Sequence, residues 1–347
     1  MTTVPEKASI LLIYTGGTIG MKENAPGEPL RPFDFDHILS EVPELGKFAL
    51  KIDSYTFDPL IDSSDVEPGL WIALAKLIEA SREKYDGFVV LHGTDTMAYS
   101  ASALSFMLEG LDKPVIFTGS QLPISTLRTD GKENLVSAVE IASAKDGQGR
   151  ARVPEVAVFF GSTLLRGNRC TKVDSESFTA FKSPNCPPLA EAGINIVYND
   201  AIIHRPEPGQ PFRIRTKLDT SVSVLKIHPG ITADLARYFL CGPATRASII
   251  ETYGSGNAIS KPWFIDILKE ADRRGKVLLN VSQCLSGGVN MDLYATGKAL
   301  EGAGVISGYD CTTECALTKL FVLLGEYEDN AAVKSALNEN LRGEITK

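Results

Sequence analysis

The chain has 347 residues, of which 44% are hydrophobic and 22% charged, a composition typical of a globular protein and a length that favours two domains over one core. The net charge of −8, from 43 acidic and 35 basic side chains, argues against nucleic acid as a partner, because phosphate binding depends on clustered lysine and arginine. The first apolar run, at 10–14, is too short for a signal-peptide core or a membrane span, so we expect a cytoplasmic protein with no membrane partner.

Short apolar runs alternate with amphipathic stretches through the first two hundred residues. The runs predict buried strands at 10–14, 88–91, 114–118 and 156–160, and the stretches between them predict helices that start at Pro68 and cover 96–108 and 134–144. In the helix that begins at Pro68 we expect one apolar face, made of Leu70, Ala73, Leu74, Leu77 and Ile78. Strand and helix in alternation imply right-handed crossovers and an α/β fold with a mostly parallel sheet flanked by helices.

The pattern lapses between 199 and 217, where three prolines fall within six positions and predict a linker. Beyond it we expect strands at 222–227, 248–251 and 276–281 and a late helix marked by Leu317 and Leu320. A helix between the first two strands is expected to bury Ile231, Leu235, Tyr238 and Phe239. The predicted organisation is a larger N-terminal catalytic domain at 1–200, a linker at 201–217 and a smaller C-terminal α/β domain at 218–347.

The spacing of cysteine and histidine gives no support for a metal site. The six cysteines lack the C-x-x-C spacing of zinc sites, and the four histidines are scattered along the chain. We expect reduced and mostly buried thiols, and neither a metal nor a disulfide framework.

Two threonine-bearing turns follow predicted strands directly. Thr15-Gly16-Gly17-Thr18 follows the strand at 10–14, and His92-Gly93-Thr94-Asp95-Thr96 follows the strand at 88–91. Loops at the carboxyl ends of strands in an α/β sheet line the ligand crevice, and glycine lets a backbone approach a ligand closely. Each turn alone is a weak signal, since a glycine pair after a strand is most often a tight turn. Together they predict a site with two hydroxyls.

The segments 14–20 and 90–97 together resemble the two signature segments of the bacterial-type L-asparaginase family. The likeness extends to 62–65, 166–172, 282–287 and 294–297, so it covers nearly the whole chain, and the last segments are similar to the cytosolic type I branch. The resemblance implies a two-domain amidohydrolase. It would hydrolyse L-asparagine to L-aspartate and ammonia through a covalent threonyl intermediate, without a cofactor.

Amide hydrolysis needs a nucleophile, a group that takes its proton and donors for the oxyanion. By resemblance Thr18 is the nucleophile, and Thr94, Asp95 and Lys172 form a triad in which a desolvated lysine acts as base. The resemblance also implies that Asp95 holds the substrate's α-amino group. The family's α-carboxylate loop corresponds to Asp62, Ser63 and Ser64.

The same residues have ordinary structural interpretations that the resemblance does not remove. Lys172 alone is typical of a solvated surface lysine, Asp62 of a turn residue and Asp95 of the N-cap of a helix that begins at Thr96. His92 is expected to be a hydrogen-bonded structural residue rather than a general base.

One departure from the family concerns a tyrosine. Many relatives carry a catalytic tyrosine about ten residues after the nucleophile, but the loop 21–31 has none, and Glu28 stands at the counted position. Some relatives supply the tyrosine from the C-terminal domain of a neighbouring subunit, and Tyr294 is the candidate here, with an ordinary interface aromatic as the alternative. The relatives are typically dimers or tetramers, so we expect a homodimer or homotetramer.

Two other functions remain open. The amidase subunit of a tRNA-dependent amidotransferase shares these motifs, although that subunit usually carries an extra amino-terminal domain, and only nine residues precede the first predicted strand here. A non-catalytic small-molecule-binding module is the third possibility. Since one methylene in a pocket is worth only about 1–3 kcal/mol, the sequence does not set the preference for asparagine over glutamine.

Overall fold

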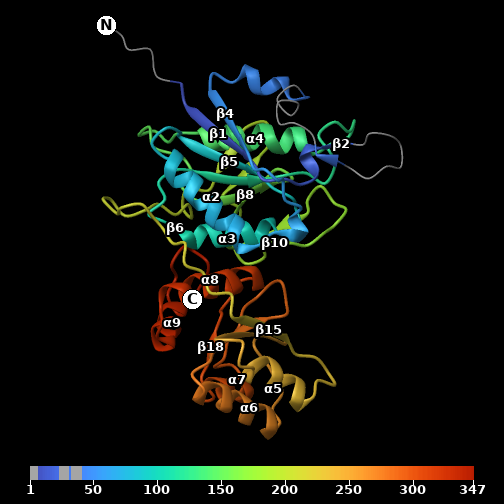
Figure 1. Cartoon of the computed structure of the whole chain (residues 1–347), viewed down its shortest axis with the longest axis vertical. Coiled ribbons are helices and arrows are strands. Elements are labelled where there is room, and N and C mark those ends of the chain that lie inside the picture. Colours follow the sequence, from blue (N-terminus) through green and yellow to red (C-terminus); the bar gives the residue numbers. More distant parts are fainter. Residues whose placement is uncertain (1–6, 23–30, 33–40) are drawn as a thin grey trace. The chain divides into compact units, whose positions relative to one another are not determined.

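The computed structural model describes residues 7–22, 31–32 and 41–347, and they divide into two compact units. Unit 1 runs to Ser183 and includes Pro187–Ile214, and unit 2 comprises Pro184–Cys186 and Arg215–Lys347. In Figure 1 most of unit 1 is coloured from blue to yellow-green, and most of unit 2 from yellow through orange to red. The predicted α/β class with a larger and a smaller domain is confirmed.

Unit 1 is built on an eight-stranded sheet in the order β13-β12-β9-β8-β7-β5-β1-β4. The strands from β4 through β1, β5 and β7 to β8 are parallel, and the pairs β8–β9, β9–β12 and β12–β13 are antiparallel. Their bounds are β1 Ser9–Tyr14, β4 Lys51–Thr56, β5 Gly87–Leu91, β7 Val115–Thr118, β8 Val156–Phe160, β9 Thr163–Arg166, β12 Ala190–Ala192 and β13 Ile196–Tyr198. β1 is the point at which strand order reverses, because β4 follows it on one side and β5 on the other.

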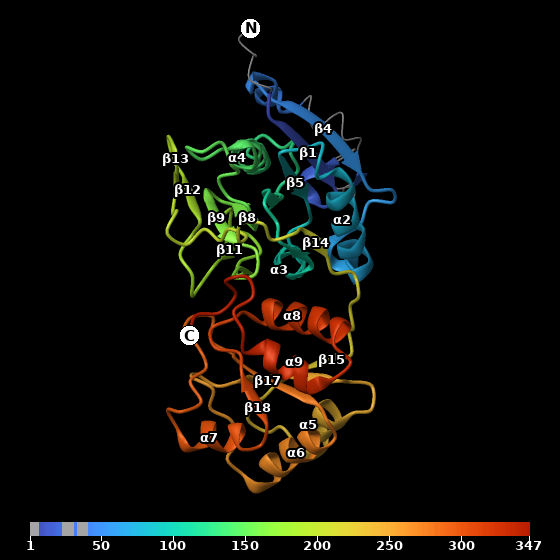
Figure 2. The same ribbon diagram turned by 90° about the vertical axis from the view of Figure 1, so that its left-hand side faces the viewer.

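Helices cover both faces of this sheet. Figure 2 places α4 on one face and α2 and α3 on the other, and their bounds are α2 Pro68–Ser81, α3 Met97–Met107 and α4 Gly131–Ser143. Coverage on both faces explains why β1, β5, β7 and β8 are continuous apolar runs. The predicted face of α2 is only partly right, since Trp71 and Ala75 are buried with Leu70, while Ala73 and Leu77 are half-buried.

Short elements complete unit 1. Three are 3₁₀ turns, η1 Thr18–Gly20, η2 Pro43–Lys47 and η3 Ser63–Asp65, and the others are strand pairs: β2 Met21–Lys22 with β3 Arg31–Pro32, β10 Thr171–Lys172 with β11 Phe181–Lys182, and β6 Leu108–Glu109 with β14 Arg213–Ile214. β14 falls inside the range expected as a linker, so the chain is still hydrogen-bonded to unit 1 at Ile214. The predicted domain limits themselves stay a prediction.

Unit 2 has a four-stranded parallel sheet in the order β15-β16-β17-β18. Its strands are β15 Val222–Lys226, β16 Ala247–Thr252, β17 Val277–Ser282 and β18 Val305–Ser307, and its helices are α5 Ala233–Cys241, α6 Pro262–Arg273, α7 Ala295–Glu301, α8 Thr313–Glu326 and α9 Asn330–Leu337. Neighbouring residues of one strand pack into different hydrophobic clusters. Leu278 packs with α5 and α6, and Leu279 packs with α8 and α9.

The predicted buried face of the α5 region is only half right, because Ile231 is buried and Phe239 packs half-buried against the core. Leu235 is 48% exposed and Tyr238 75% exposed, whereas Ala236 and Leu240 are buried. Ile231 precedes the helix, whose N-cap is Thr232, so a helical period counted from Ile231 also selects exposed positions. All six cysteines are free thiols. In the described part of the chain no helix combines the length and apolarity needed to cross a bilayer.

Candidate active site

The two threonine turns leave adjacent parallel strands at the same end. Tyr14 at the end of β1 pairs with Leu91 at the end of β5. Thr15 continues the contact, because its backbone N and its Oγ1 each donate to Leu91 O at 3.0 Å. The loops that carry Thr18 and Thr94 therefore start side by side at the strand reversal, where α/β sheets bind ligands.

Two glycines allow the turns to touch. Gly17 has φ +96°, and a Cβ on it would lie 2.5 Å from both the N and the Cα of Gly93. A Cβ on Gly93 would in turn lie 2.5 Å from Oγ of Ser63, in the loop after β4. Ile61 of that loop donates its N–H to Thr15 O at 2.8 Å. Three loops thus meet so closely that there is no room for a side chain at Gly17 or at Gly93.

Thr18 is the first residue of η1 and is half-buried, whereas Gly17 and Ile19 on either side are buried. The turn is held from inside, because Gly20 N donates to Gly17 O at 3.3 Å and Ile124 N donates to Ile19 O at 3.1 Å. A buried isoleucine fixes the turn while its threonine stays partly open to a ligand.

Lys172 joins the second turn from far along the chain. It lies at the end of β10, and its Nζ donates to Thr94 Oγ1 at 2.8 Å and to Asp95 Oδ1 at 2.7 Å. Thr94 is 9% exposed, and the side chains of Lys172 and Asp95 are 19% and 62% exposed. The structure brings the three predicted triad residues into one contact. Their catalytic roles stay a prediction.

Two structural interpretations of these residues are wrong. The N-cap of α3 is Thr96 and not Asp95, because the Asp95 carboxylate faces Lys172 and the Thr96 hydroxyl donates to Ser63 O at 2.6 Å. Lys172 is not a solvated surface lysine, since two protein oxygens bind its ammonium.

Asp62 forms a local turn, as its structural interpretation predicted. Its Oδ1 accepts from both the N–H and the hydroxyl of Ser64 at 2.9 Å. Ser63, between them, is 6% exposed and packs against Gly93. The loop therefore lies beside the two turns, and its role in holding a substrate carboxylate stays a prediction.

His92 is fully hydrogen-bonded inside unit 1. Its Nδ1 lies 2.7 Å from Gly93 O, and Ser100 Oγ lies 2.9 Å from its Nε2 and accepts from Trp71 Nε1 at 2.9 Å. Because a carbonyl only accepts, Nδ1 carries the ring proton and Nε2 accepts from Ser100. Burial lowers the pKa of His92 to about 4, so the ring is neutral and structural.

Gln121 is a contact of the site that sequence reasoning missed. Thr94 Oγ1 lies 3.4 Å from Gln121 Oε1, so that Gln121 is a second partner of this hydroxyl in addition to Lys172. Gln121 follows β7, the parallel neighbour of β5. The reasoning that selected the loops after β1 and β5 applies equally to this third loop.

Two predictions about a tyrosine stay open. Positions 23–30 of the loop after Thr18, with Glu28, lie outside the described residues. Tyr294 is the N-cap of α7 in unit 2 and is 51% exposed. Among the residues described, no group of three His, Cys, Asp or Glu side chains has the geometry to hold a metal ion.

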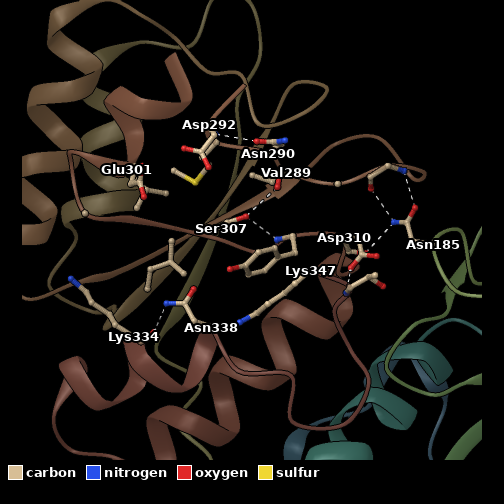
Figure 3. A pocket seen from close by; sticks show the side chains of 18 residues that line it. Asn185, Val289, Asn290, Asp292, Glu301, Ser307, Asp310, Lys334, Asn338 and Lys347 are labelled. Carbon is tan, nitrogen blue, oxygen red and sulfur yellow. Dashed lines mark hydrogen bonds between the residues drawn. The ribbon is translucent and has the colours of Figure 1, made fainter. Parts of the chain in front are cut away.

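Unit 2 contains a cavity of about 930 Å³, shown in Figure 3. The amines that line it have partners of their own: Lys334 Nζ lies 2.6 Å from Asp272 Oδ1, and Lys347 Nζ lies 5.5 Å from the ring centroid of Tyr309. The hydroxyl of Ser307 donates to Val289 O. These contacts of the two amines are with a carboxylate and an aromatic ring and not with a hydroxyl, so we assign the candidate site to unit 1.

Comparison with known proteins matches nearly the whole chain to one family. Family models match both parts of the chain, "Asparaginase, N-terminal" at 9–204 and "Glutaminase/Asparaginase C-terminal domain" at 221–337. The chain is 46% identical to L-asparaginase 1 of Escherichia coli K12, over 98% of this chain and 99% of that protein. The crystal structure of L-asparaginase I from Vibrio cholerae has a TM-score of 0.89 and 42% identity, covering 98% of this chain and 100% of that one. A glutamyl-tRNA(Gln) amidotransferase component from Sulfurisphaera tokodaii is 33% identical, over 98% of this chain and 76% of its own length.

Proposed function

The chain belongs to the asparaginase family, and from this membership we propose that it hydrolyses L-asparagine to L-aspartate and ammonia. The observation that carries the proposal is the contact of Lys172 Nζ with Thr94 Oγ1 and Asp95 Oδ1 at 2.8 and 2.7 Å. This contact joins a hydroxyl, an amine and a carboxylate, and the turn of Thr94 meets the turn of Thr18 at Gly93 and Gly17. The set supports threonine-based amide hydrolysis.

The reaction proceeds in two steps. Thr18 Oγ1 attacks the carbon of the side-chain amide, the C–N bond breaks, and ammonia leaves with the proton of the threonine. Water then attacks the resulting aspartyl ester of Thr18 and releases aspartate. In this second step neutral Lys172 takes a proton from Thr94, and Thr94 takes one from the attacking water. The proton then passes from Lys172 to Thr18 Oγ1 as the ester bond breaks, so that both threonines are hydroxyls again and Lys172 is neutral. Backbone N–H groups at Gly93 and Thr94 stabilise the oxyanion.

A small amino acid substrate suits the surroundings of the triad. The Asp95 side chain is 62% exposed, so one carboxylate oxygen remains open to a substrate ammonium while Oδ1 accepts from Lys172. Ser63, beside Gly93, and the adjoining loop give small side chains for the substrate's α-carboxylate.

We place the enzyme in the cytoplasm as a homodimer or homotetramer, with Tyr294 entering the site of a neighbouring subunit. The exposure of Tyr294 in unit 2 and the lack of a tyrosine in 21–31 support this role of Tyr294. The reaction needs no cofactor, because threonine, lysine and aspartate supply nucleophile, base and charge.

The amidotransferase alternative has less support. Identity is 33% to the amidotransferase component and 46% to the asparaginase. A binding module without catalysis would not require a lysine held between a threonine and an aspartate.

The test is ammonia release from L-asparagine by purified protein, expressed in a host that lacks its own asparaginases. Thr18→Ala and Thr94→Ala should each lower the rate by roughly 10⁴-fold or more, whereas Thr126→Ala, an exposed threonine of unit 1, should leave it unchanged. Mass spectrometry of acid-quenched enzyme should find the aspartyl ester on the peptide that contains Thr18. Ammonia release within tenfold of the wild-type rate by either variant would remove that threonine from the mechanism.

A further inference from the structure

The Thr94 hydroxyl has two polar neighbours with opposite hydrogen-bonding roles. Lys172 Nζ lies 2.8 Å from Oγ1, and Gln121 Oε1 lies 3.4 Å from it. An ammonium only donates, so it binds a lone pair of Thr94, and the proton of this hydroxyl is left for Gln121. The second hydrogen bond is long, as catalytic hydrogen bonds often are before substrate binds.

The other contact of Gln121 fixes the orientation of its carboxamide. Nε2 lies 3.1 Å from Ser177 O, and a carbonyl only accepts, so the NH₂ group faces Ser177 and Oε1 faces Thr94. Ser177 lies between β10 and β11, the hairpin that carries Lys172. The Gln121 side chain therefore contacts both the Thr94 hydroxyl and the hairpin that carries Lys172.

The backbone of Gln121 is also held. Its N–H donates to both carboxylate oxygens of Asp130, at 3.0 and 3.1 Å, and Leu122 N donates to Oδ1 at 3.3 Å. Asn134 Nδ2 donates to Asp130 Oδ2 at 3.2 Å and to Gly119 O at 3.0 Å. Asp130 is 9% exposed and Asn134 2%. A buried clamp thus fixes the loop after β7, and with it the point from which the Gln121 side chain extends.

We infer that Gln121 is a positioning residue that holds the Thr94 proton away from Lys172 and holds the Lys172 hairpin within reach of Thr94. While the amine is protonated, the Thr94 hydroxyl donates its hydrogen bond to Gln121 Oε1. Once the amine is neutral, the proton turns to Nζ and is transferred there. The inference rests on the proposed function, in which Thr94 passes a proton to Lys172.

Two substitutions at Gln121 separate this role from simple packing. Gln121→Met keeps the length and removes both hydrogen bonds, and it should lower kcat about 10- to 100-fold while KM changes less than about threefold. Gln121→Glu keeps the acceptor but adds a negative charge about 6 Å from Nζ at most. This charge should raise the pKa of Lys172 and move the acidic limb of the kcat–pH profile upward by about one unit. Gln148→Met, an exposed glutamine of the same unit, is the control and should match the wild type.

The charged groups on the elements around Lys172 are the same in every variant. They are Asp95 after β5, Asp174, Glu176 and Lys182 on its own hairpin, Asp62 after β4 and Asp130 beneath Gln121. A shift of the profile in Gln121→Glu is therefore due to the new carboxylate.

A readout without catalysis distinguishes failure of the inference from failure of the proposed function. In protein labelled with ¹⁵N at lysine Nζ, the Lys172 signal is assigned by its loss in Lys172→Met, and its titration is followed in wild type and Gln121→Glu. We expect a higher pKa in Gln121→Glu, whether or not the wild type releases ammonia. An unmoved Lys172 titration would overturn the inference. A wild-type kcat in Gln121→Met would also overturn it. So would a lower kcat in Gln121→Met that comes with lower thermal stability, if the kcat–pH profile of Gln121→Glu is unshifted.

Discussion

Lowering the pH should destabilise unit 1 through His92. The ring is 1% exposed, and burial lowers its pKa to about 4 from the ordinary 6.5. Between these two values the unfolded chain binds a proton that the folded chain does not, so stability falls as the pH falls. The contribution is fully present above pH 6.5 and is lost progressively down to pH 4.

The size of the effect follows from the two pKa values. A single group with this shift changes the free energy of unfolding by about 1.4 kcal/mol per pH unit between them, which gives a loss of about 2 kcal/mol between pH 7 and pH 5. Carboxylates such as Asp86 and Asp146 have lowered pKa values because of partners such as Lys145 and Arg150. Their contribution is lost mostly below pH 5, so His92 dominates the upper part of the range.

Urea unfolding measured at each pH provides the assay. The chain has two tryptophans, Trp71 in unit 1 and Trp263 in unit 2, so a Trp263→Phe background makes fluorescence report unit 1 alone. In that background His92→Gln should remove the decline between pH 7 and pH 5, whatever its effect at pH 7. If the free energy of unfolding declines equally in both proteins, the buried His92 ring is not neutral. The direction of the hydrogen bonds from Trp71 through Ser100 to His92 would then be wrong as well.

The remaining predictions concern catalysis and assembly. Lys172→Met and Asp95→Asn should each lower kcat/KM by at least roughly 10³-fold and the double variant hardly further, since groups that act as a unit are not additive; losses that multiply would contradict the unit. Gly17→Ala should abolish activity and lower the melting temperature, because its Cβ would lie 2.5 Å from backbone atoms. Gly69→Ala in α2, where nothing lies within 4 Å, should be neutral or stabilising, and similar melting temperatures for the two would exclude the close turn contact. Tyr294→Phe should lower kcat without changing the oligomer, and mixing with Lys172→Met subunits should restore activity; full activity of Tyr294→Phe alone would exclude it.

The central strands could be predicted well from the sequence and the sheet edges poorly, for one physical reason. β1, β5, β7 and β8 are covered by helices, so burial selected continuous apolar runs. β4 is an edge strand whose residues are all exposed or half-buried, and β12 has three residues, so neither leaves an apolar run to detect. Half of the predicted face of α5 failed for a similar reason, since exposed Leu235 and Tyr238 have the spacing of buried residues.

The candidate site also contains some residues that could be predicted from the sequence pattern and others that could not. The positions of the Thr18 and Thr94 turns follow from strand order and glycine placement, which are visible in the sequence. Lys172 lies 78 residues beyond Thr94 on a two-residue strand, where no periodicity marks it, and only the family resemblance selected it. Gln121 was missed although it follows a predicted strand, because a glutamine carries no charge or nucleophile that attracts attention.

Burial distinguishes the ion pair of Lys172 and Asp95 in unit 1 from a structural pair in unit 2. Lys319 and Glu344 are 4% and 0% exposed, and the ammonium also donates to Leu337 O and Glu339 O. Breaking such a pair leaves an uncompensated buried charge and typically costs about 3–5 kcal/mol. Lys172 and Asp95 are 19% and 62% exposed, and a pair so open to water contributes at most about 1 kcal/mol. Its contacts with Thr94 therefore serve positioning more than stability, so loss of Lys172 should reduce the rate while unit 1 remains folded.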